Sequence, residues 1–224
     1  MNGKTKTKII LKFLEKTRYW CHRAVIEAYQ KMMESGTDYH EWEEEDISKA
    51  LYEEMKKLDL VRNKEITIIP EFRLYGAKYS KKKAKAKEAD RIDFLFSRWK
   101  LNVELEYFGE AKNLSSKTWT KSHNEATVDA SYYGGRYIDT GIKHLTSGSY
   151  ALLNGFLIGY IVNGSAKENL DSLNSLIIKR KLPPKIGLIE NPKPICSYPA
   201  CYTSKNIEKK EEVILQHIFL EFDK

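Results

Sequence analysis

Two segments of alternating side chains, separated by a short polar break, constrain this chain more than any other part of its sequence. They cover residues 91–96 and 102–112. Side chains alternate across a β-strand, so residues two apart share a face. Glu110 and Lys112 therefore project together, from the face of the second strand that is not expected to pack. If the strands pair as a hairpin, Asp93 lies beside Glu110, which predicts two carboxylates and one ammonium group within a few ångströms.

The first strand is expected to bury the face opposite Asp93, through the apolar residues Ile92, Phe94 and Phe96. Adjacent carboxylates repel each other unless a cation lies between them, and their oxygens suit Mg²⁺ or Mn²⁺, with water and substrate phosphate as the remaining ligands. A lysine beside such an ion can orient or deprotonate the attacking water, or stabilise charge on a phosphate. The pattern indicates phosphodiester hydrolysis. The alternative for the same residues is an exposed strand face held by salt bridges.

The pattern Asp93 … Glu110-x-Lys112 resembles the signature of the PD-(D/E)XK, or restriction-endonuclease-like, nuclease superfamily. In that signature an acid on one strand precedes acid-x-lysine on the next. The resemblance implies an α/β fold with a restriction-endonuclease-like core, a mixed central β-sheet flanked by α-helices. It also implies a Mg²⁺- or Mn²⁺-dependent endonuclease acting on DNA, of the restriction or anti-phage defence type, with Asp93 and Glu110 as metal ligands and Lys112 as the catalytic lysine.

The superfamily often adds a glutamate from a helix that precedes the sheet, and the candidate here, for metal binding and catalysis, is Glu44. A helix is expected over residues 42–58, with an apolar stripe formed by Ile47, Leu51, Met55 and Leu58. At about 100° per residue Glu44 falls close to this stripe, so the acid is aimed toward the core. The alternative is a helix-start acid that complements the helix dipole. Glu45 and Glu71 are the other candidates for a third carboxylate.

The first part of the chain has apolar residues at a helical period, which predicts a long amphipathic helix over residues 5–35. This helix either covers the sheet or forms a surface for a partner or a second copy. A chain of 224 residues is large enough for one α/β domain with a full core. We therefore expect a single nuclease-like domain, with the N-terminal helix in residues 1–40 and the core in residues 41–224.

An excess of basic residues favours an anionic partner. The formal charge is +7 and the isoelectric point is about 9.0. Residues 76–90 carry a lysine run that is either solvated or in contact with phosphate, and its candidates for nucleic-acid binding are Lys81, Lys82 and Lys83. Arg136 and Lys143, seven residues apart, share one face of an expected helix and suit phosphate contacts as well. The expected partner is nucleic acid, with DNA favoured over RNA.

A second part of the resemblance lies downstream. A helix with the apolar stripe Ile138, Ile142 and Leu145 precedes an apolar strand over residues 156–162. Related defence nucleases have a Tyr-x-x-x-Gly-x-x-(Arg)-Phe helix before a strand containing Gly-Tyr, and the matching residues here are Tyr137, Gly141, Gly159 and Tyr160. His144 and Leu145 replace the expected Arg-Phe. A helix is expected over residues 165–180 and a last strand over 213–222, whereas residues 113–130 are expected to form a loop.

No stretch of the sequence has the uninterrupted apolar length of a membrane helix, and the N-terminal residues lead into an amphipathic helix instead of a signal-peptide core. We therefore expect a cytoplasmic protein without a membrane partner, working as a homodimer or with a partner defence subunit. Two other functions fit the same residues. One is a catalytically inactive nucleic-acid-binding or scaffold subunit that keeps the fold. The other is an RNA-directed nuclease.

Overall fold

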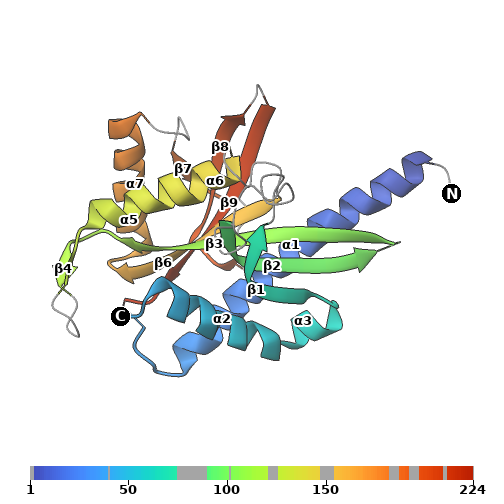
Figure 1. Cartoon of the computed structure of the whole chain (residues 1–224), viewed down its shortest axis with the longest axis horizontal. Coiled ribbons are helices and arrows are strands. Elements are labelled where there is room, and N and C mark those ends of the chain that lie inside the picture. Colours follow the sequence, from blue (N-terminus) through green and yellow to red (C-terminus); the bar gives the residue numbers. More distant parts are fainter. Residues whose placement is uncertain are drawn as a thin grey trace, which may run out of the picture.

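The structure, a computed structural model, describes residues 3–39, 41–74, 90–100, 102–120, 126–146, 154–181, 187–191, 197–208 and 211–223. Over these residues the chain forms an α/β fold in which helices cover both faces of a mixed seven-stranded sheet (Figure 1). The expected fold class is confirmed at this level. The long N-terminal helix α1 (Gly3–Glu34) is also present as expected.

The sheet has parallel strands at its centre and antiparallel strands outside them. From edge to edge its order is β1 (Thr67–Leu74), β2 (Asp90–Lys100), β3 (Val103–Ser115), β6 (Gly155–Asn163), β9 (Glu211–Glu221), β8 (Cys201–Glu208) and β7 (Leu188–Glu190). β3 pairs in parallel with β6, and β6 with β9, while the other neighbours are antiparallel. Parallel neighbours need a crossover connection, so the chain between β3 and β6 has to return over a face of the sheet.

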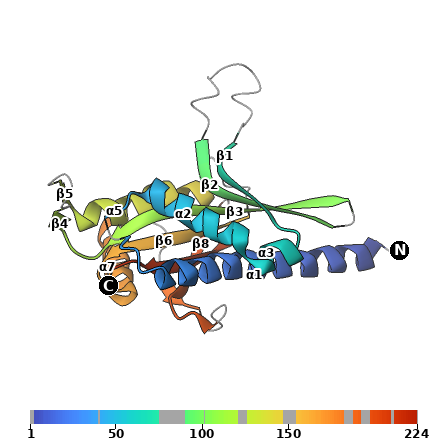
Figure 2. The ribbon, with the colours of Figure 1, turned by 90° about the horizontal axis from the view of Figure 1, so that it is seen from below.

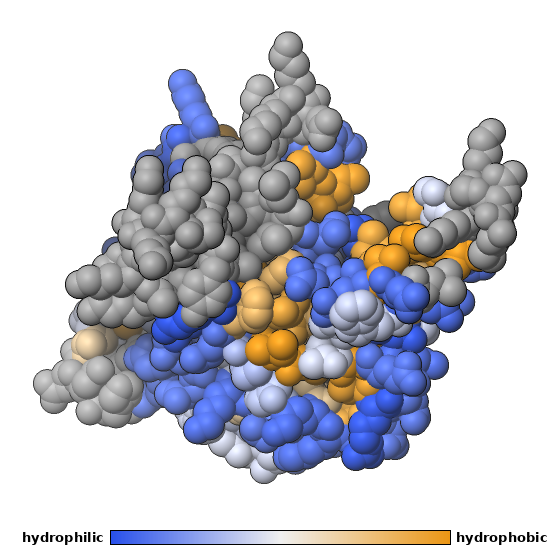
Figure 3. Space-filling model, turned by 45° about the vertical axis from the view of Figure 1, so that its right-hand side comes forward, coloured by the Kyte–Doolittle hydropathy of each residue, from blue (hydrophilic) through white to orange (hydrophobic). Residues whose placement is uncertain are grey.

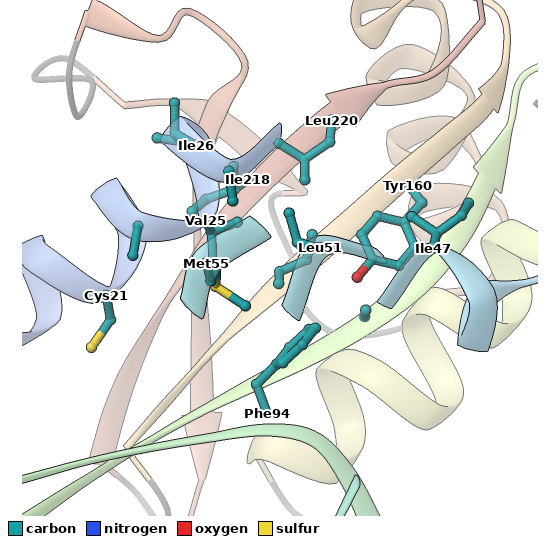
Figure 4. Close-up of a cluster of buried hydrophobic side chains, with 14 of the residues drawn as sticks. Cys21, Val25, Ile26, Ile47, Leu51, Met55, Phe94, Tyr160, Ile218 and Leu220 are labelled. Carbon is teal, nitrogen blue, oxygen red and sulfur yellow. The ribbon is translucent and has the colours of Figure 1, made fainter. Parts of the chain in front are cut away.

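One face of the sheet is covered by α1, α2 (Glu44–Lys57) and the short α3 (Asp59–Asn63) (Figure 2). Leu58, the last residue of the predicted apolar stripe, is buried at the C-cap of α2, and the helix itself buries the other three, Ile47, Leu51 and Met55. Figure 4 shows these side chains directed toward Val25 of α1 and toward the strand residues Phe94, Tyr160, Ile218 and Leu220. The N-terminal helix thus covers the sheet, one of the two roles considered for it.

The other face is covered by α7 (Ala166–Arg180) and by one continuous helical segment of three parts, α5 (Ala130–Arg136), the π-helix η2 (Tyr137–Ile142) and α6 (Lys143–Thr146). This segment is the crossover between β3 and β6. It buries the predicted stripe Ile138, Ile142 and Leu145 against the sheet and α7. Helix α7 begins with a capping box, in which the Ser165 hydroxyl and the Glu168 carboxylate each accept a hydrogen bond from the other residue's backbone N–H.

The packing faces of β2 differ from the prediction. Phe94 and Phe96 pack beneath α1 and α2, but Ile92 packs in the cluster on the opposite face, so the expectation of one shared face was wrong. The regular alternation breaks between them because no pairing joins Asp93 to Glu71, the residue facing it on β1, and Glu71 has a φ of 50°. β1 is an edge strand, a position that tolerates Pro70 because proline has no backbone N–H to donate to a neighbouring strand.

Residues 113–130 are not the loop that was expected. β3 continues to Ser115, and a two-stranded ribbon follows, formed by β4 (Trp119–Thr120) and β5 (Thr127–Val128). The other expected elements are confirmed to within a few residues, whereas β7 and β8 were not predicted. None of the helices in the described ranges is long and apolar enough to cross a membrane. Among the coloured residues of Figure 3, hydrophilic side chains predominate, and hydrophobic side chains gather in patches near the centre and toward the upper right.

Candidate functional site

The candidate site lies where β2 separates from β3. Pairing between these strands extends to Phe94 and Gly109, which places the next residues, Asp93 and Glu110, side by side as predicted. Beyond this point β2 no longer pairs with β3, and the Asp93 side chain provides an acceptor for the β3 backbone instead. Its Oδ2 accepts a hydrogen bond of 2.7 Å from the backbone N–H of Ala111. Asp93 is therefore fixed by the same backbone that carries Glu110 and Lys112.

Lys112 lies at the centre of the site, with carboxylates of three elements around its ammonium group. Its Nζ is 2.7 Å from Glu110 Oε1, 3.2 Å from Glu44 Oε1 and 3.8 Å from Asp93 Oδ2, and it donates to the backbone carbonyl of Ala111 at 2.5 Å. The side chains of Lys112 and Glu110 are each only 6% exposed. The predicted cluster of two carboxylates and a lysine is present, and Glu44 joins it.

Glu44 reaches this cluster from the first turn of α2. Its Oε2 accepts a hydrogen bond of 3.1 Å from the backbone N–H of Asn113, and its Oε1 contacts both Lys112 and, at 3.5 Å, Arg136. The expectation that this acid points inward is confirmed, because its side chain is 15% exposed. Asp93 and Glu44 thus bind alternate N–H groups along the part of β3 that β2 leaves.

Burial and the crowded charges shift the pKa values of the cluster. Burial, together with the neighbouring negative charge of Asp93, raises the pKa of Glu110 to about 8. Burial also raises the pKa of Asp93, although Lys112 and the Ala111 N–H oppose that rise. For Lys112 burial favours the neutral amine, but Glu110, Asp93 and Glu44 outweigh it and the pKa is raised. Lys112 is therefore a positively charged group at neutral pH.

The cluster is more enclosed than the sequence suggested. The face of β3 that carries Glu110 and Lys112 was expected not to pack, but both residues are buried, with 4% and 5% of their surface exposed. The prediction was wrong because the segment α5–η2–α6 crosses this face. Gly141 of the π-helix allows the close approach, since a Cβ atom there would lie 2.8 Å from Leu157 Cδ2 and 3.9 Å from Lys112 Cγ.

A pocket of about 300 Å³ opens onto the cluster. It is lined by the carboxylates and Lys112 and, from the crossover helices, by Arg136, Thr140 and His144, which together form the crossover wall. Lys143, predicted with Arg136 as a phosphate contact, is not among the lining residues, and its Nζ lies 2.5 Å from Asp139 Oδ1. Thr140 and His144 were not predicted as site residues.

The π-helix accounts for this difference. In a regular α-helix, seven residues turn through about 700°, so Arg136 and Lys143 would differ in direction by only about 20°. A π-helix closes its turns with i→i+5 hydrogen bonds and is wider. More residues are therefore needed before a side chain points in the same direction as Arg136. As a result, His144 lies at the pocket instead of Lys143. Nothing in the residue spacing signals this change of phase.

The remaining candidates lie at different places. Glu45 lines the pocket, where it forms an ion pair with Arg91, and Glu71 lies 3.4 Å from the same arginine. Both side chains are mostly exposed, at 64% and 60%. They bind Arg91 and not the Lys112 ammonium group, so Glu44 is the third carboxylate of the cluster. Lys81, Lys82 and Lys83 lie outside the described residues.

The donor atoms fit a Mg²⁺ or Mn²⁺ ion held by two protein carboxylates. Within the described part of the chain, Glu110 Oε2 is buried beside Asp93 and has no hydrogen-bond partner, and such an oxygen is well suited to a cation. In the described ranges no set of three His, Cys, Asp or Glu side chains is arranged to hold a metal. Mg²⁺ commonly binds one or two carboxylates and takes water and substrate phosphate for the rest, so the pair is sufficient.

Comparison of the whole chain with protein-family models, with curated proteins and with solved structures gives no match.

Proposed function

We propose that this protein is a divalent-metal-dependent nuclease that hydrolyses phosphodiester bonds, most readily in DNA, on a restriction-endonuclease-like core. One observation carries the proposal. The ammonium group of Lys112 is buried among Glu110, Glu44 and Asp93 at an open pocket. Buried charges are costly to desolvate, and groups with strongly perturbed pKa values gather at functional sites.

Asp93 and Glu110 are the residues that would hold the metal ion. When bound, the ion would supply Lewis-acid stabilisation of the phosphate charge. The chain itself contributes rigidity, because Asp93 is anchored to the Ala111 N–H and Glu110 to the Lys112 ammonium group. Both carboxylates are thus fixed before substrate arrives, which is what electrostatic preorganisation requires.

Lys112 carries the positive charge of the site and three N–H donors. With its pKa raised, this group stabilises negative charge on the phosphate electrostatically, while its N–H groups donate to Glu110, Glu44 and the Ala111 carbonyl. Glu44 holds Lys112 from the other side and also contacts Arg136, so it positions both cations. A role for Glu44 as a metal ligand stays a prediction, because both of its oxygens already accept hydrogen bonds.

A non-catalytic nucleic-acid-binding or scaffold protein is the second candidate. It is favoured by the direct contact of 2.7 Å between Lys112 and Glu110, which neutralises one of the two carboxylates within the chain. A buried ion-pair network of this kind can serve structure alone. The two candidates differ in whether Asp93 and Glu110 bind a metal and support turnover.

The deciding experiment incubates the purified protein with plasmid DNA, single-stranded DNA and RNA, in Mg²⁺, in Mn²⁺ and in EDTA. We expect metal-dependent cleavage, strongest on DNA, that Asp93→Asn and Glu110→Gln each abolish while nucleic-acid binding in EDTA persists. The matched control is Asp59→Asn, an exposed acid of α3 that pairs with Arg62 and is not among the residues that line the pocket. Metal-dependent cleavage by either Asp93→Asn or Glu110→Gln would falsify the site, and no cleavage by the unaltered protein would favour the binding protein.

A further inference from the structure

Two donor side chains line the pocket from the crossover helices, beside the carboxylate cluster. Arg136 closes α5 and His144 belongs to α6, with Thr140 of the π-helix between them. Arg136, Thr140 and His144 follow one another at intervals of four residues. In a regular α-helix each interval of four residues overshoots a full turn by about 40°, so the first and last would diverge by about 80°. The wider turn of the π-helix removes that divergence and brings all three to one pocket.

We propose that the crossover wall is the phosphate-binding side of the site, and that His144 and Arg136 contact the same substrate phosphate from either side of Thr140. The inference rests on the proposed function for the identity of the substrate as a phosphodiester. It names His144 as a substrate-contacting residue, at the position where the downstream pattern has an arginine in place of this histidine.

The charges of the pocket support this division. Glu44, Asp93 and Glu110 gather acidic side chains on the part of the pocket formed by α2, β2 and β3, which disfavours a phosphate except next to a cation. Donors of the crossover wall can hold an incoming phosphate beside these acids. The guanidinium of Arg136 has five N–H donors and is 38% exposed, and its contact with Glu44 occupies one nitrogen. An imidazole can donate from one or both ring nitrogens.

Thr140 supports the wall without contributing a donor of its own. Its hydroxyl donates to the backbone carbonyl of Arg136 at 2.8 Å, so its proton is already used. The small side chain leaves room between Arg136 and His144. Two donors separated by a short side chain suit the separate oxygens of one tetrahedral phosphate, whereas a bulky residue at this position would fill the space.

The first arm of the test does not depend on cleavage. Inorganic phosphate is titrated into the full chain while the histidine ring resonances are followed by NMR, and the His144 signal is identified by its loss in His144→Gln. We expect that signal to shift and saturate at millimolar phosphate, while the signals of the buried His22 and His217 stay in place. Arg136→Ala should abolish the shift. An unchanged His144 signal, or a shift that survives Arg136→Ala, overturns the inference.

The second arm measures cleavage kinetics. Loss of a hydrogen bond to a charged group predicts that His144→Ala lowers kcat/KM by about tenfold or more, and His144→Gln, which keeps an N–H donor, should recover part of it. Arg136→Ala and His144→Ala should combine less than additively, because both contact one phosphate. The matched control is Thr146→Val, which removes a hydrogen bond of 2.8 Å to the Ile142 carbonyl in the same helix, outside the pocket.

The two arms separate the possible failures. If the unaltered protein cleaves nucleic acid but His144→Ala does so at the same rate, the phosphate-wall inference is wrong and the nuclease proposal stands. The unaltered protein could instead fail to cleave any nucleic acid, while inorganic phosphate still shifts the His144 signal in an Arg136-dependent way. In that case the wall is a phosphate site and the nuclease proposal is wrong.

Discussion

At the scale of single residues, the site depends on Lys112. A lysine that is 5% exposed would lose its proton in an apolar environment, yet here its pKa is raised, because three carboxylates outweigh the cost of burial. The burial of each charged group in this cluster depends on the opposite charge of its partners. Removing the lysine leaves Glu110, Asp93 and Glu44 close together without the cation that separates them.

Lys112→Ala is therefore expected to act on both rate and stability. The cleavage rate should fall by about a hundredfold or more, as for loss of a positioned charge-stabilising group. Breaking a buried ion-pair network by removing one partner should also lower the free energy of unfolding, by about 3–5 kcal/mol. Thermal denaturation and single-turnover cleavage measure the two effects.

The control variants for this residue are Lys112→Arg and Lys112→Met. Arginine keeps the charge but has a planar, larger head group, so it should restore stability better than rate. Methionine fills the space without charge and should leave the rate low. If Lys112→Ala cleaved at the unaltered rate, the acid-x-lysine pattern would be accidental and the scaffold candidate would be preferred.

His217 gives a prediction that is independent of the site. It is fully buried, with hydrogen bonds of 2.8 Å to both the Tyr137 hydroxyl and the Ser204 hydroxyl, and burial lowers its pKa to about 3. In the unfolded chain a histidine titrates near pH 6.5. Between about pH 6.5 and 3 the unfolded state therefore binds a proton that the folded state does not.

The free energy of unfolding should therefore decrease as the pH is lowered through this window, by about 1.4 kcal/mol per pH unit from His217 alone. Urea denaturation at several pH values measures this effect. The free energy of unfolding should change less with pH in His217→Gln than in the unaltered protein. The native protein offers a second measurement, because its His217 ring resonances should not titrate between pH 7 and 5. A ring that does titrate in that range contradicts the lowered pKa.

At the scale of elements, the capping box at the start of α7 is expected to stabilise the fold. Ser165→Ala removes the hydroxyl that accepts from the Glu168 N–H, and the expected loss is about 0.5–2 kcal/mol. Ser172→Ala is the matched control, since Ser172 is an exposed residue within the same helix. Equal unfolding midpoints for the two variants would contradict the role of the cap.

The elements also show what could be predicted and what could not. The contact of Asp93, Glu110 and Lys112 followed from the alternation of a strand, which is a local property. β8 was missed because the residues it buries include Ser204 and Asn206, whose polar side chains form a network with His217, so the apolar alternation is absent. The place of His144 depends on a π-helix, and the burial of the site depends on packing by a distant crossover. Neither is encoded in residue spacing.

At the scale of the whole molecule, the net charge of +7 predicts salt-dependent binding. Each phosphate neutralised by a lysine or arginine should contribute about −0.9 to the slope of log affinity against log salt on duplex DNA. If Lys81, Lys82, Lys83, Arg136 and Lys143 contact phosphates, replacing them singly by alanine should reduce the slope by about one each. Fluorescence anisotropy in EDTA measures this, and a flat dependence would leave these residues as solvated charges.

The carboxylates that line the pocket also close the edge of a strand. Where β2 leaves β3, the backbone N–H groups of Ala111 and Asn113 are bound by Asp93 and Glu44. Unpaired edges of this kind are templates for strands of other chains, and proteins often protect them with charged side chains. Asp93 and Glu44, which we propose to act in metal binding and in positioning Lys112, thus also guard against self-association. A variant lacking both should become prone to aggregation, so its loss of solubility would have to be separated from its loss of activity.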